Sequence, residues 1–176
     1  MKPTVTSSEL VFRGFFDVRK DRLMRHDGEL LDYTSIVLPW SASIVLAQDK
    51  EGRYILNREY RHPTGESLLG CPGGRLEEGE EPLKAAEREF YEETGYWSDH
   101  FTLIGSCYPF PSLCNQKIFF FHAKDAYLKG KQDPDPFEFI KVELKTKEEL
   151  RKELKSGAPI DSLLCAALWY QNVHIT

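Results

Sequence analysis

The sequence predicts an α/β fold in which a mixed β-sheet is covered by helices. Three observations favour it: many short apolar runs with strand character, a few helical patterns between them, and no internal repeat or low-complexity tract. The 176 residues are 41% hydrophobic and 29% charged, which is enough apolar surface for one core but not comfortably for two. We therefore expect one domain, residues 1–176.

The N-terminal part is expected to form strands. Two short strand-like runs with turn residues beside them, at Lys20-Asp21 and His26-Asp27-Gly28, predict a β-hairpin. Stretches rich in β-branched and large apolar residues then predict core strands. The hairpin runs are Phe12–Asp17 and Arg22–His26, and the core strands are Leu30–Leu38, Ala42–Ala47 and Arg53–Tyr60, the last two joined by a turn at residues 49–52.

A loop dense in glycine and proline, residues 70–74, leads into a helix over Leu83–Thr94. Pro82 marks the start of this helix and Gly95 marks its end. The segment Lys129–Pro136 is expected to be a mobile surface loop. Further strands are expected at Phe101–Tyr108, Lys117–Ala123 and Phe137–Leu144, and further helices at Lys147–Lys155 and Asp161–Tyr170.

Charge and composition exclude several classes of protein. A formal net charge of −5 argues against a surface that wraps long nucleic acids, because such a surface needs a basic face. The N-terminus has no apolar signal segment, and the most apolar stretch, residues 36–47, is interrupted by Pro39. The four cysteines form no CxxC pair and no zinc pattern with the histidines. We expect a cytoplasmic protein with reduced thiols and no membrane contact.

The helix over Leu83–Thr94 carries an unusual concentration of acid. On a helical wheel, Leu83, Ala86 and Phe90 form an apolar side, while Glu89, Glu92 and Glu93 gather on another. These carboxylates repel one another near the C-terminal end of the helix, where the helix dipole also disfavours anions.

Two interpretations of the acidic helix stay open. One is an ordinary solvated face. The other is a site for Mg²⁺, or alternatively Mn²⁺, because hard cations prefer oxygen ligands. The glycine-rich loop favours the second interpretation, since its backbone can approach a ligand closely. Arg88 also favours it, since a guanidinium can orient the glutamates by charge-assisted hydrogen bonds.

Gly74, Glu80 and the segment Arg88–Tyr96 match the Nudix box, GX5EX7REUXEEXGU with U a bulky apolar residue, at every position. This resemblance implies an α/β/α sandwich that hydrolyses a nucleoside diphosphate linked to another moiety, with metal held by the glutamates of the box. It also implies the metal-binding residues: Glu89 and Glu93 as principal ligands, Glu92 as a further ligand, Glu80 as a supporting acid, and the Gly73 carbonyl as a backbone ligand.

Outside the box, the chain resembles the branch of ADP-ribose pyrophosphatases and nucleoside diphosphate sugar hydrolases over nearly its whole length. Arg58–Pro63 is similar to that branch's Q-[FY]-R-x-P segment, and residues 71–74 are similar to its L-P-A-G. Pro111 stands where the branch has a proline after the box, and Ser156–Asp161 is similar to its final helix-turn-helix. The resemblance further implies that the N-terminal strands, residues 1–35, are exchanged across the interface of a homodimer.

By this resemblance, Arg61 contacts the diphosphate, since a guanidinium binds phosphate oxygens bidentately. Phe15, Phe16 and Tyr33 occupy positions where the branch places aromatic rings against the base. Each assignment has an alternative: a solvated arginine at a strand end, and phenylalanines packed in the core.

The general base is expected in a loop beyond the box, and Glu138 is the best match. An acid that begins an edge strand is the alternative interpretation of Glu138, and Glu92 is the alternative base. The chain departs from the branch at Gly70 and Gln116, which stand where the branch usually has acids, so substrates of the branch other than ADP-ribose stay open. ADP-ribose or another nucleoside diphosphate sugar is the expected substrate.

Two rivals remain. One is a Nudix hydrolase of a dinucleoside polyphosphate or a non-standard nucleoside triphosphate. The other is a sensor that binds a nucleotide sugar without cleaving it. The complete set of box glutamates argues against the sensor, because binding alone has no chemical need for all of them.

Overall fold

The computed structural model describes residues 2–172, which fall into two compact units. Unit 1 comprises the chain up to Ser41 together with Tyr108–Lys117. Unit 2 comprises Ala42–Cys107 and the chain from Ile118 onward. The expectation of a single domain stays a prediction, since one folding domain can contain two compact units.

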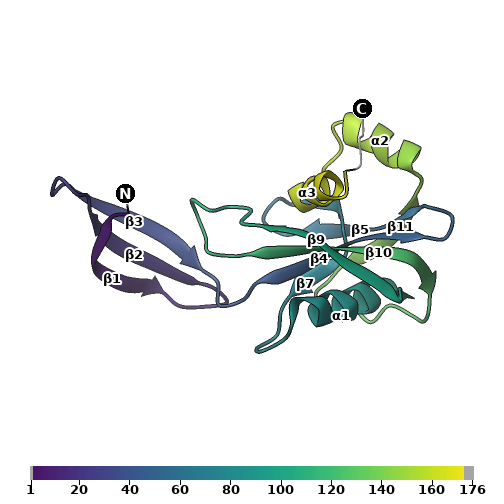
Figure 1. Ribbon diagram of the computed structural model, residues 1–176, viewed down its shortest axis with the longest axis horizontal. Coiled ribbons are helices and arrows are strands. Elements are labelled where there is room, and N and C mark those ends of the chain that lie inside the picture. Colours follow the sequence, from purple (N-terminus) through teal and green to yellow (C-terminus); the bar gives the residue numbers. More distant parts are fainter. Residues whose placement is uncertain (1, 173–176) are drawn as a thin grey trace. The chain divides into compact units, whose positions relative to one another are not determined.

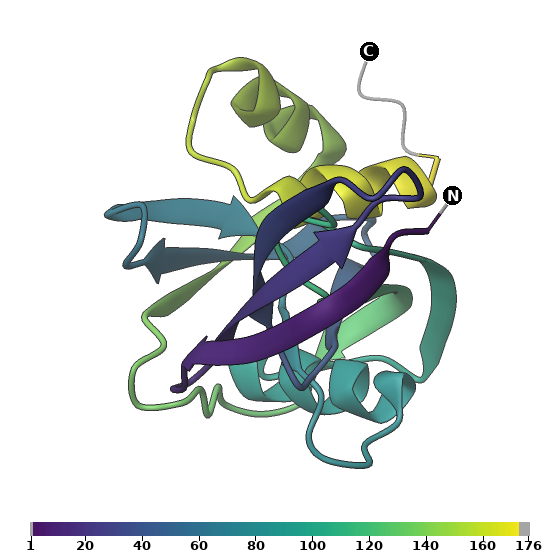
Figure 2. The same cartoon turned by 90° about the vertical axis from the view of Figure 1, so that its left-hand side faces the viewer.

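Unit 1 is built on a three-stranded antiparallel sheet in the order β1-β2-β3, whose strands run side by side in Figure 2. The strands are β1 (Thr4–Phe12), β2 (Asp17–Met24) and β3 (Leu30–Val37). The predicted N-terminal hairpin is confirmed by the antiparallel pairing of β1 and β2, but its predicted bounds are wrong: Lys20-Asp21 lies inside β2, and β1 was missed. The turn at His26–Gly28 is confirmed, with the Gly28 N–H donating to the carbonyl of Arg25 at 2.9 Å.

Unit 2 contains an eight-stranded mixed sheet, as predicted. Its main path is β11-β5-β4-β10-β8, with β6, β7 and β9 paired to β5, β4 and β10. β4 and β10 are parallel, and the other paired strands are antiparallel. The strands are β4 (Ala42–Asp49), β5 (Tyr54–Arg61), β6 (Glu66–Gly70), β7 (Gly73–Arg75), β8 (Tyr96–Trp97), β9 (His100–Cys107), β10 (Ile118–Leu128) and β11 (Ile140–Lys145).

Helices cover both faces of this sheet, which confirms the α/β/α sandwich (Figure 1). α1 (Pro82–Thr94) lies on one face, and α2 (Lys147–Lys155) and α3 (Ser162–Tyr170) lie on the other. Local signals set the helix ends, because Pro82 stands in the first turn of α1 and Gly95 adopts the left-handed conformation, φ 72°. Within residues 2–172, no helix combines the length and apolar character needed to cross a membrane.

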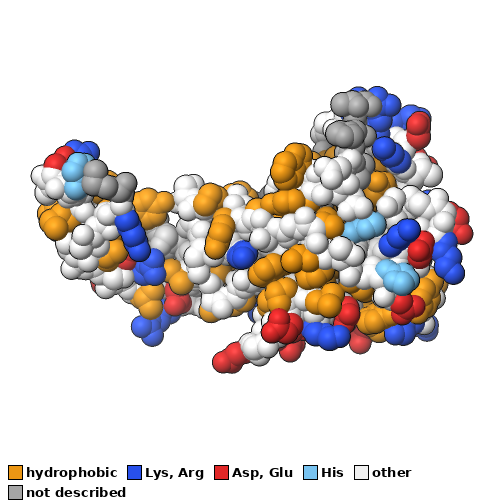
Figure 3. Space-filling view, viewed as in Figure 1, with side chains coloured by type: hydrophobic (Ala, Val, Ile, Leu, Met, Phe, Trp, Pro, Cys, Tyr) orange, Lys and Arg blue, Asp and Glu red, His pale blue; other side chains and the backbone are white. Residues whose placement is uncertain are grey.

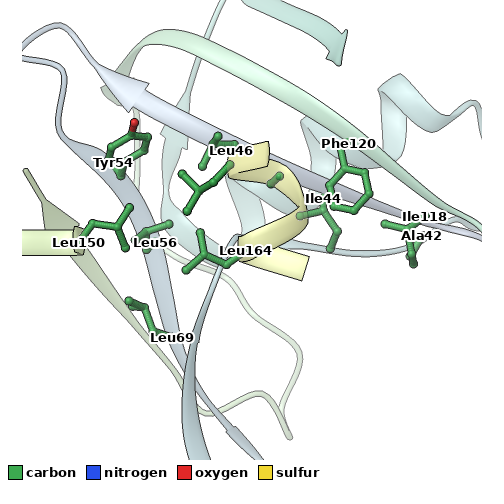
Figure 4. Close-up of a cluster of buried hydrophobic side chains, with 12 residues drawn as sticks. Ala42, Ile44, Leu46, Tyr54, Leu56, Leu69, Ile118, Phe120, Leu150 and Leu164 are labelled. Atoms are coloured by element: carbon green, nitrogen blue, oxygen red, sulfur yellow. The ribbon is translucent and has the colours of Figure 1, made fainter. Parts of the chain in front are cut away.

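The core of unit 2 lies on both sides of β4. Leu46, Phe120 and Leu164 belong to the cluster beneath α3 (Figure 4), and Val45 and Phe90 belong to the cluster beneath α1. Alternate residues of a strand point to opposite faces of the sheet. Because both faces of β4 are covered, its sequence is a nearly continuous apolar run. Burying each large side chain contributes roughly 1.5–3 kcal/mol, so these two clusters fix α1 and α3 against the sheet.

The stretch that follows β10 holds the C-terminal end of α1. The Lys129 N–H donates to the carbonyl of Gly95 at 2.9 Å, and the Asp133 N–H donates to that of Glu92 at 2.8 Å. The Gln132 side-chain amide donates to the carbonyl of Glu93 at 2.5 Å. The segment expected as a mobile loop is irregular but tied to α1 at three points.

Candidate active site

The site in unit 2 begins where β7 runs beside α1, and two glycines allow the close approach. A side chain at Gly74 would place its Cβ 2.5 Å from the carboxylate of Glu89. Gly73 has φ +144°, and a Cβ there would lie 2.2 Å from the carbonyl oxygen of Ser43. A side chain at Gly73 would clash with the backbone and one at Gly74 would displace the Glu89 carboxylate, which explains the glycine-rich loop before the helix.

The wheel separated α1 incorrectly into an apolar face and an acidic face. Leu83 is 37% exposed and does not belong to the core, whereas Ala86 and Phe90 are fully buried. Glu89 and Glu93 are only 8% and 3% exposed. These acids are buried because polar groups of β5 and β7, which a helical wheel does not contain, lie over them.

Glu93 is held by two donors. Its Oε2 accepts the backbone N–H of Gly73 at 2.7 Å and the side-chain amide of Asn57 at 2.9 Å. Burial raises the pKa of Glu93 well above its ordinary value, and the nearby charges of Glu89, Glu59 and Glu138 raise this pKa further. The Gly73 hydrogen bond opposes these effects without cancelling them.

Arg88 lies among three other glutamates and orients them, as expected. Its guanidinium donates to Glu80 through Nε and Nη2, both at 3.0 Å, and its Nη1 donates to Glu89 at 2.8 Å and Glu92 at 3.1 Å. The Arg88 hydrogen bond lowers the pKa of Glu80. Burial raises the pKa of Glu89, and Arg88 opposes that rise. Acidic and basic side chains therefore mingle on the surface near α1 (Figure 3).

β5 contributes Asn57, Glu59 and Arg61, which alternate along the strand and so share one face of it. Arg61 Nη1 lies 2.6 Å from Glu59 Oε1. Burial raises the pKa of Glu59, and Arg61 opposes that rise. Asn57 and Glu59 were not predicted as site residues, although the sequence carries a signal for them: a polar i, i+2, i+4 series follows the buried run Tyr54–Leu56.

Gly70 borders the same part of the site. Asn57, Glu59 and Arg61 line a hollow of about 10 Å³, which Gly70 and the side chain of Asp161 also line. A Cβ at Gly70 would lie 3.3 Å from the Cβ of Asp161. The carboxylate of Asp161, which caps α3, therefore lies beside the position where Gly70 has none.

Glu138 lies in a short turn, two residues before the start of β11. Its carboxylate accepts the Asp135 N–H at 3.0 Å, and its own N–H donates to the Asp135 carbonyl at 2.9 Å. The negative charge of Glu138 contributes to the raised pKa values of Glu59, Glu89 and Glu93. Glu138 therefore belongs to the same group of acids as the box glutamates.

The remaining predicted residues belong to unit 1. Tyr33 and Pro111 line one hollow of about 340 Å³, and the Tyr33 hydroxyl donates to the carbonyl of Ser112 at 2.5 Å. Phe15 is 70% exposed and Phe16 is half-exposed, so neither is a core residue. The alternative that placed the phenylalanine pair in the core is wrong.

The chemical type of the candidate ligand atoms, which are carboxylate and carbonyl oxygens, suits a hard divalent cation. In residues 2–172, no three His, Cys, Asp or Glu side chains are already gathered as a metal site, and Arg88 holds three of the glutamates instead. Every candidate donor is nevertheless an oxygen, as such cations require. The buried pair Glu89 and Glu93 raise each other's energy when both are ionised, and a nearby cation reverses that effect.

Residues 37–165 match the family model for the NUDIX domain. The chain belongs to the Nudix family. This Nudix enzyme is a pyrophosphohydrolase, and its resemblance to the ADP-ribose pyrophosphatase branch is confirmed. The ADP-ribose pyrophosphatase of Bacillus subtilis (strain 168) is 34% identical over 130 residues, which cover 73% of this chain and 70% of that protein.

Two further similarities extend the comparison. The methanol dehydrogenase activator of Bacillus methanolicus is 30% identical over 132 residues, again 73% of this chain and 70% of that protein. A crystal structure of an ADP compounds hydrolase superposes with a TM-score of 0.87 at 24% identity, covering 98% of this chain and 93% of that chain. The similarity in fold to that hydrolase thus extends over nearly the whole chain.

Proposed function

We propose that this Nudix enzyme hydrolyses the diphosphate bond of ADP-ribose or a related nucleoside diphosphate sugar, with Mg²⁺ as its divalent metal. The products are a nucleoside monophosphate and a sugar phosphate. The observation that carries the proposal is the burial of Glu89 and Glu93 against Gly73 and Gly74, since two buried carboxylates beside a tight glycine loop are costly without a cation. The similarity to an ADP-ribose pyrophosphatase supports the choice of substrate.

The chain's own residues divide the work between positioning and proton transfer. Asn57 and Gly73 fix one oxygen of Glu93, and Arg88 fixes Glu80, Glu89 and Glu92. Glu89, Glu93, Glu92 and the Gly73 carbonyl would hold the metal, with Glu80 in support. When bound, the cation neutralises charge on the phosphates and makes a water more acidic.

Hydrolysis forms one bond from a water oxygen to phosphorus and breaks the bridging P–O bond. Glu138 takes the proton of the attacking water, with Glu92 as the alternative base. Arg61 binds the diphosphate oxygens, for which it must leave Glu59. Tyr33, Phe16 and Pro111 bind the base, because their surfaces in unit 1 are accessible and Tyr33 and Pro111 share one hollow.

A substrate panel tests this proposal. Nucleoside diphosphate sugars, dinucleoside polyphosphates and nucleoside triphosphates are incubated with the protein, with Mg²⁺ or with EDTA, and the products are separated by ion-exchange chromatography. We expect Mg²⁺-dependent cleavage that is fastest for a nucleoside diphosphate sugar. If the protein cleaved no compound of the panel, the proposed enzymatic function would be wrong. If it cleaved a dinucleoside polyphosphate or a nucleoside triphosphate fastest, the proposed substrate class would be wrong.

We further propose a homodimer in the cytoplasm. Unit 1 supports the dimer, because large apolar side chains of its sheet are more than half exposed, and a small sheet needs packing for stability. These side chains are Val5, Val11, Phe12, Leu30 and Leu31. The four free cysteines are consistent with a reducing compartment. Sedimentation equilibrium at the mass of one chain would contradict the dimer.

A further inference from the structure

Asn57 is buried beside the glutamates of the site, and only one of its two polar side-chain atoms has a hydrogen-bond partner. The residue is 2% exposed, and its Nδ2 donates to Glu93. Its Oδ1 is one of three buried side-chain polar atoms without a hydrogen-bond partner in residues 2–172. Leaving a buried acceptor unpaired is unfavourable, so this oxygen is expected to have a partner that residues 2–172 do not supply.

The orientation of the amide follows from chemistry. Glu93 Oε2 already accepts the Gly73 N–H, and a Glu93 that ligates a cation is ionised and can only accept hydrogen bonds. The side of Asn57 that faces Glu93 must therefore be the amide nitrogen. With the carboxylate ionised, turning the amide over would set two acceptors against each other, so the Asn57 oxygen is left for a partner other than Glu93.

The surroundings of Asn57 select the kind of partner. Glu93 is its hydrogen-bond acceptor, and the charges of Glu59, Glu89 and Glu138 act on Glu93. A field set by so many carboxylates attracts positive charge. A neutral amide oxygen is also a ligand that hard cations accept alongside carboxylates.

We propose that the Asn57 side-chain oxygen is an additional ligand of the divalent cation, while the Asn57 nitrogen positions Glu93. One side chain would then do two things: hold an anionic ligand in place and add a donor without adding negative charge. The inference rests on the proposed function only in requiring a divalent cation. It predicts a property of the metal site that is measurable without substrate.

The test is a titration of the full chain with Mn²⁺. Binding is measured from the decrease in the electron paramagnetic resonance signal of free Mn²⁺. Asn57→Leu removes both the oxygen and the amide donor, and we expect its Kd for Mn²⁺ to rise about tenfold or more. Asn57→Asp keeps an oxygen donor but loses the hydrogen bond to Glu93. We expect Asn57→Asp to bind Mn²⁺ at least as tightly as the unaltered protein.

Thr94→Val is the matched control, because it removes a buried hydroxyl next to Glu93 in the chain and keeps the side-chain shape. We expect its Kd to stay within about twofold, and circular dichroism verifies the fold of each variant. A Kd within about twofold of the unaltered protein for Asn57→Leu would overturn the proposal. So would equal weakening in both Asn57 variants, which would leave only the positioning of Glu93, and so would an unaltered protein that binds no Mn²⁺.

Failure here and failure of the proposed function are distinguishable. If Mn²⁺ binding depended on Asn57 but no compound of the substrate panel were cleaved, the proposed function would be wrong and the Asn57 ligand would stand. If the unaltered protein cleaved a nucleotide sugar while Asn57→Leu bound Mn²⁺ normally, the proposed function would stand and the Asn57 ligand would be wrong.

Discussion

Gly74 and Glu89 lie so close that a single methyl group at Gly74 would stand 2.5 Å from the carboxylate of Glu89. This close approach brings β7 against α1 beside the buried glutamates Glu89 and Glu93. Real carbon and oxygen atoms do not approach so closely, so any side chain at Gly74 must displace Glu89. The glycine is therefore required by the site, not by the backbone conformation.

Gly74→Ala should lower kcat/KM by about 10–100-fold, since a misplacement of about 1 Å in a catalytic group has effects of that size. Gly52→Ala is the control: Gly52 has φ +77° in a hairpin turn, and nothing lies within 4 Å of a Cβ there. That control should lose about 1–2 kcal/mol of stability and keep its turnover. Steady-state kinetics with equilibrium unfolding compare the two, and equal turnover by both variants would contradict the close approach.

Glu93→Gln should stabilise the metal-free protein at pH 7. Burial raises the pKa of Glu93, so the folded state binds a proton that the unfolded state releases above its ordinary value near 4.5, and stability falls as pH rises through that range. Glutamine mimics the protonated form and keeps an acceptor for Asn57 and Gly73. We expect a higher Tm in EDTA, by roughly 2–4 °C for each kcal/mol gained.

The same variant should gain less from metal than the unaltered protein does. Adding Mg²⁺ should raise the Tm of the unaltered protein and close the gap, because a cation that binds only the folded state stabilises it. A Glu93→Gln protein that is less stable in EDTA at pH 7 would show that burial of this carboxylate carries no cost.

Arg61→Lys should raise KM about tenfold with a smaller change in kcat, because lysine keeps the charge but loses the bidentate geometry. Arg53→Lys is the matched control, since Arg53 pairs with Asp49 at 2.7 Å in the hairpin between β4 and β5. Its KM should be unchanged. An Arg61→Lys protein with normal KM but low kcat would instead assign Arg61 to the transition state.

Glu143 should make stability depend on pH in acid. Hydrogen bonds from Arg58 and Lys145 contribute to a pKa of about 2 for Glu143, below its ordinary 4.5. Stability from this group is present above pH 4.5 and is lost as pH falls from 4.5 toward 2. Glu143→Gln should cost about 1–2 kcal/mol at pH 7 after allowing for solvent screening, and almost nothing near pH 2.

Urea unfolding at several pH values measures this loss. Glu148→Gln is the control, because Glu148 lies on the exposed side of α2. A Glu143→Gln deficit that is constant between pH 2 and pH 7 would mean that the Arg58 and Lys145 contacts contribute nothing through charge.

Local chemistry decided which parts of the fold could be predicted. The helices were placed within a residue or two because proline, glycine and capping side chains mark their ends. β1 was missed because its Ser7-Ser8-Glu9 segment breaks the apolar pattern. The burial of the α1 acids could not be foreseen from the wheel, since the partners of Glu93 lie on β5 and β7, 36 and 20 residues earlier in the chain.

The central claim is that the buried acids of α1 carry a metal-dependent cleavage of a diphosphate bond. The most direct test compares Glu93→Gln with Glu87→Gln, whose carboxylate on the same helix instead pairs with Lys84 at 2.7 Å. Turnover of ADP-ribose is measured with saturating Mg²⁺. We predict that Glu87→Gln retains at least about half of the activity and that Glu93→Gln falls by about 100-fold or more. Equal activity in the two variants would contradict the account.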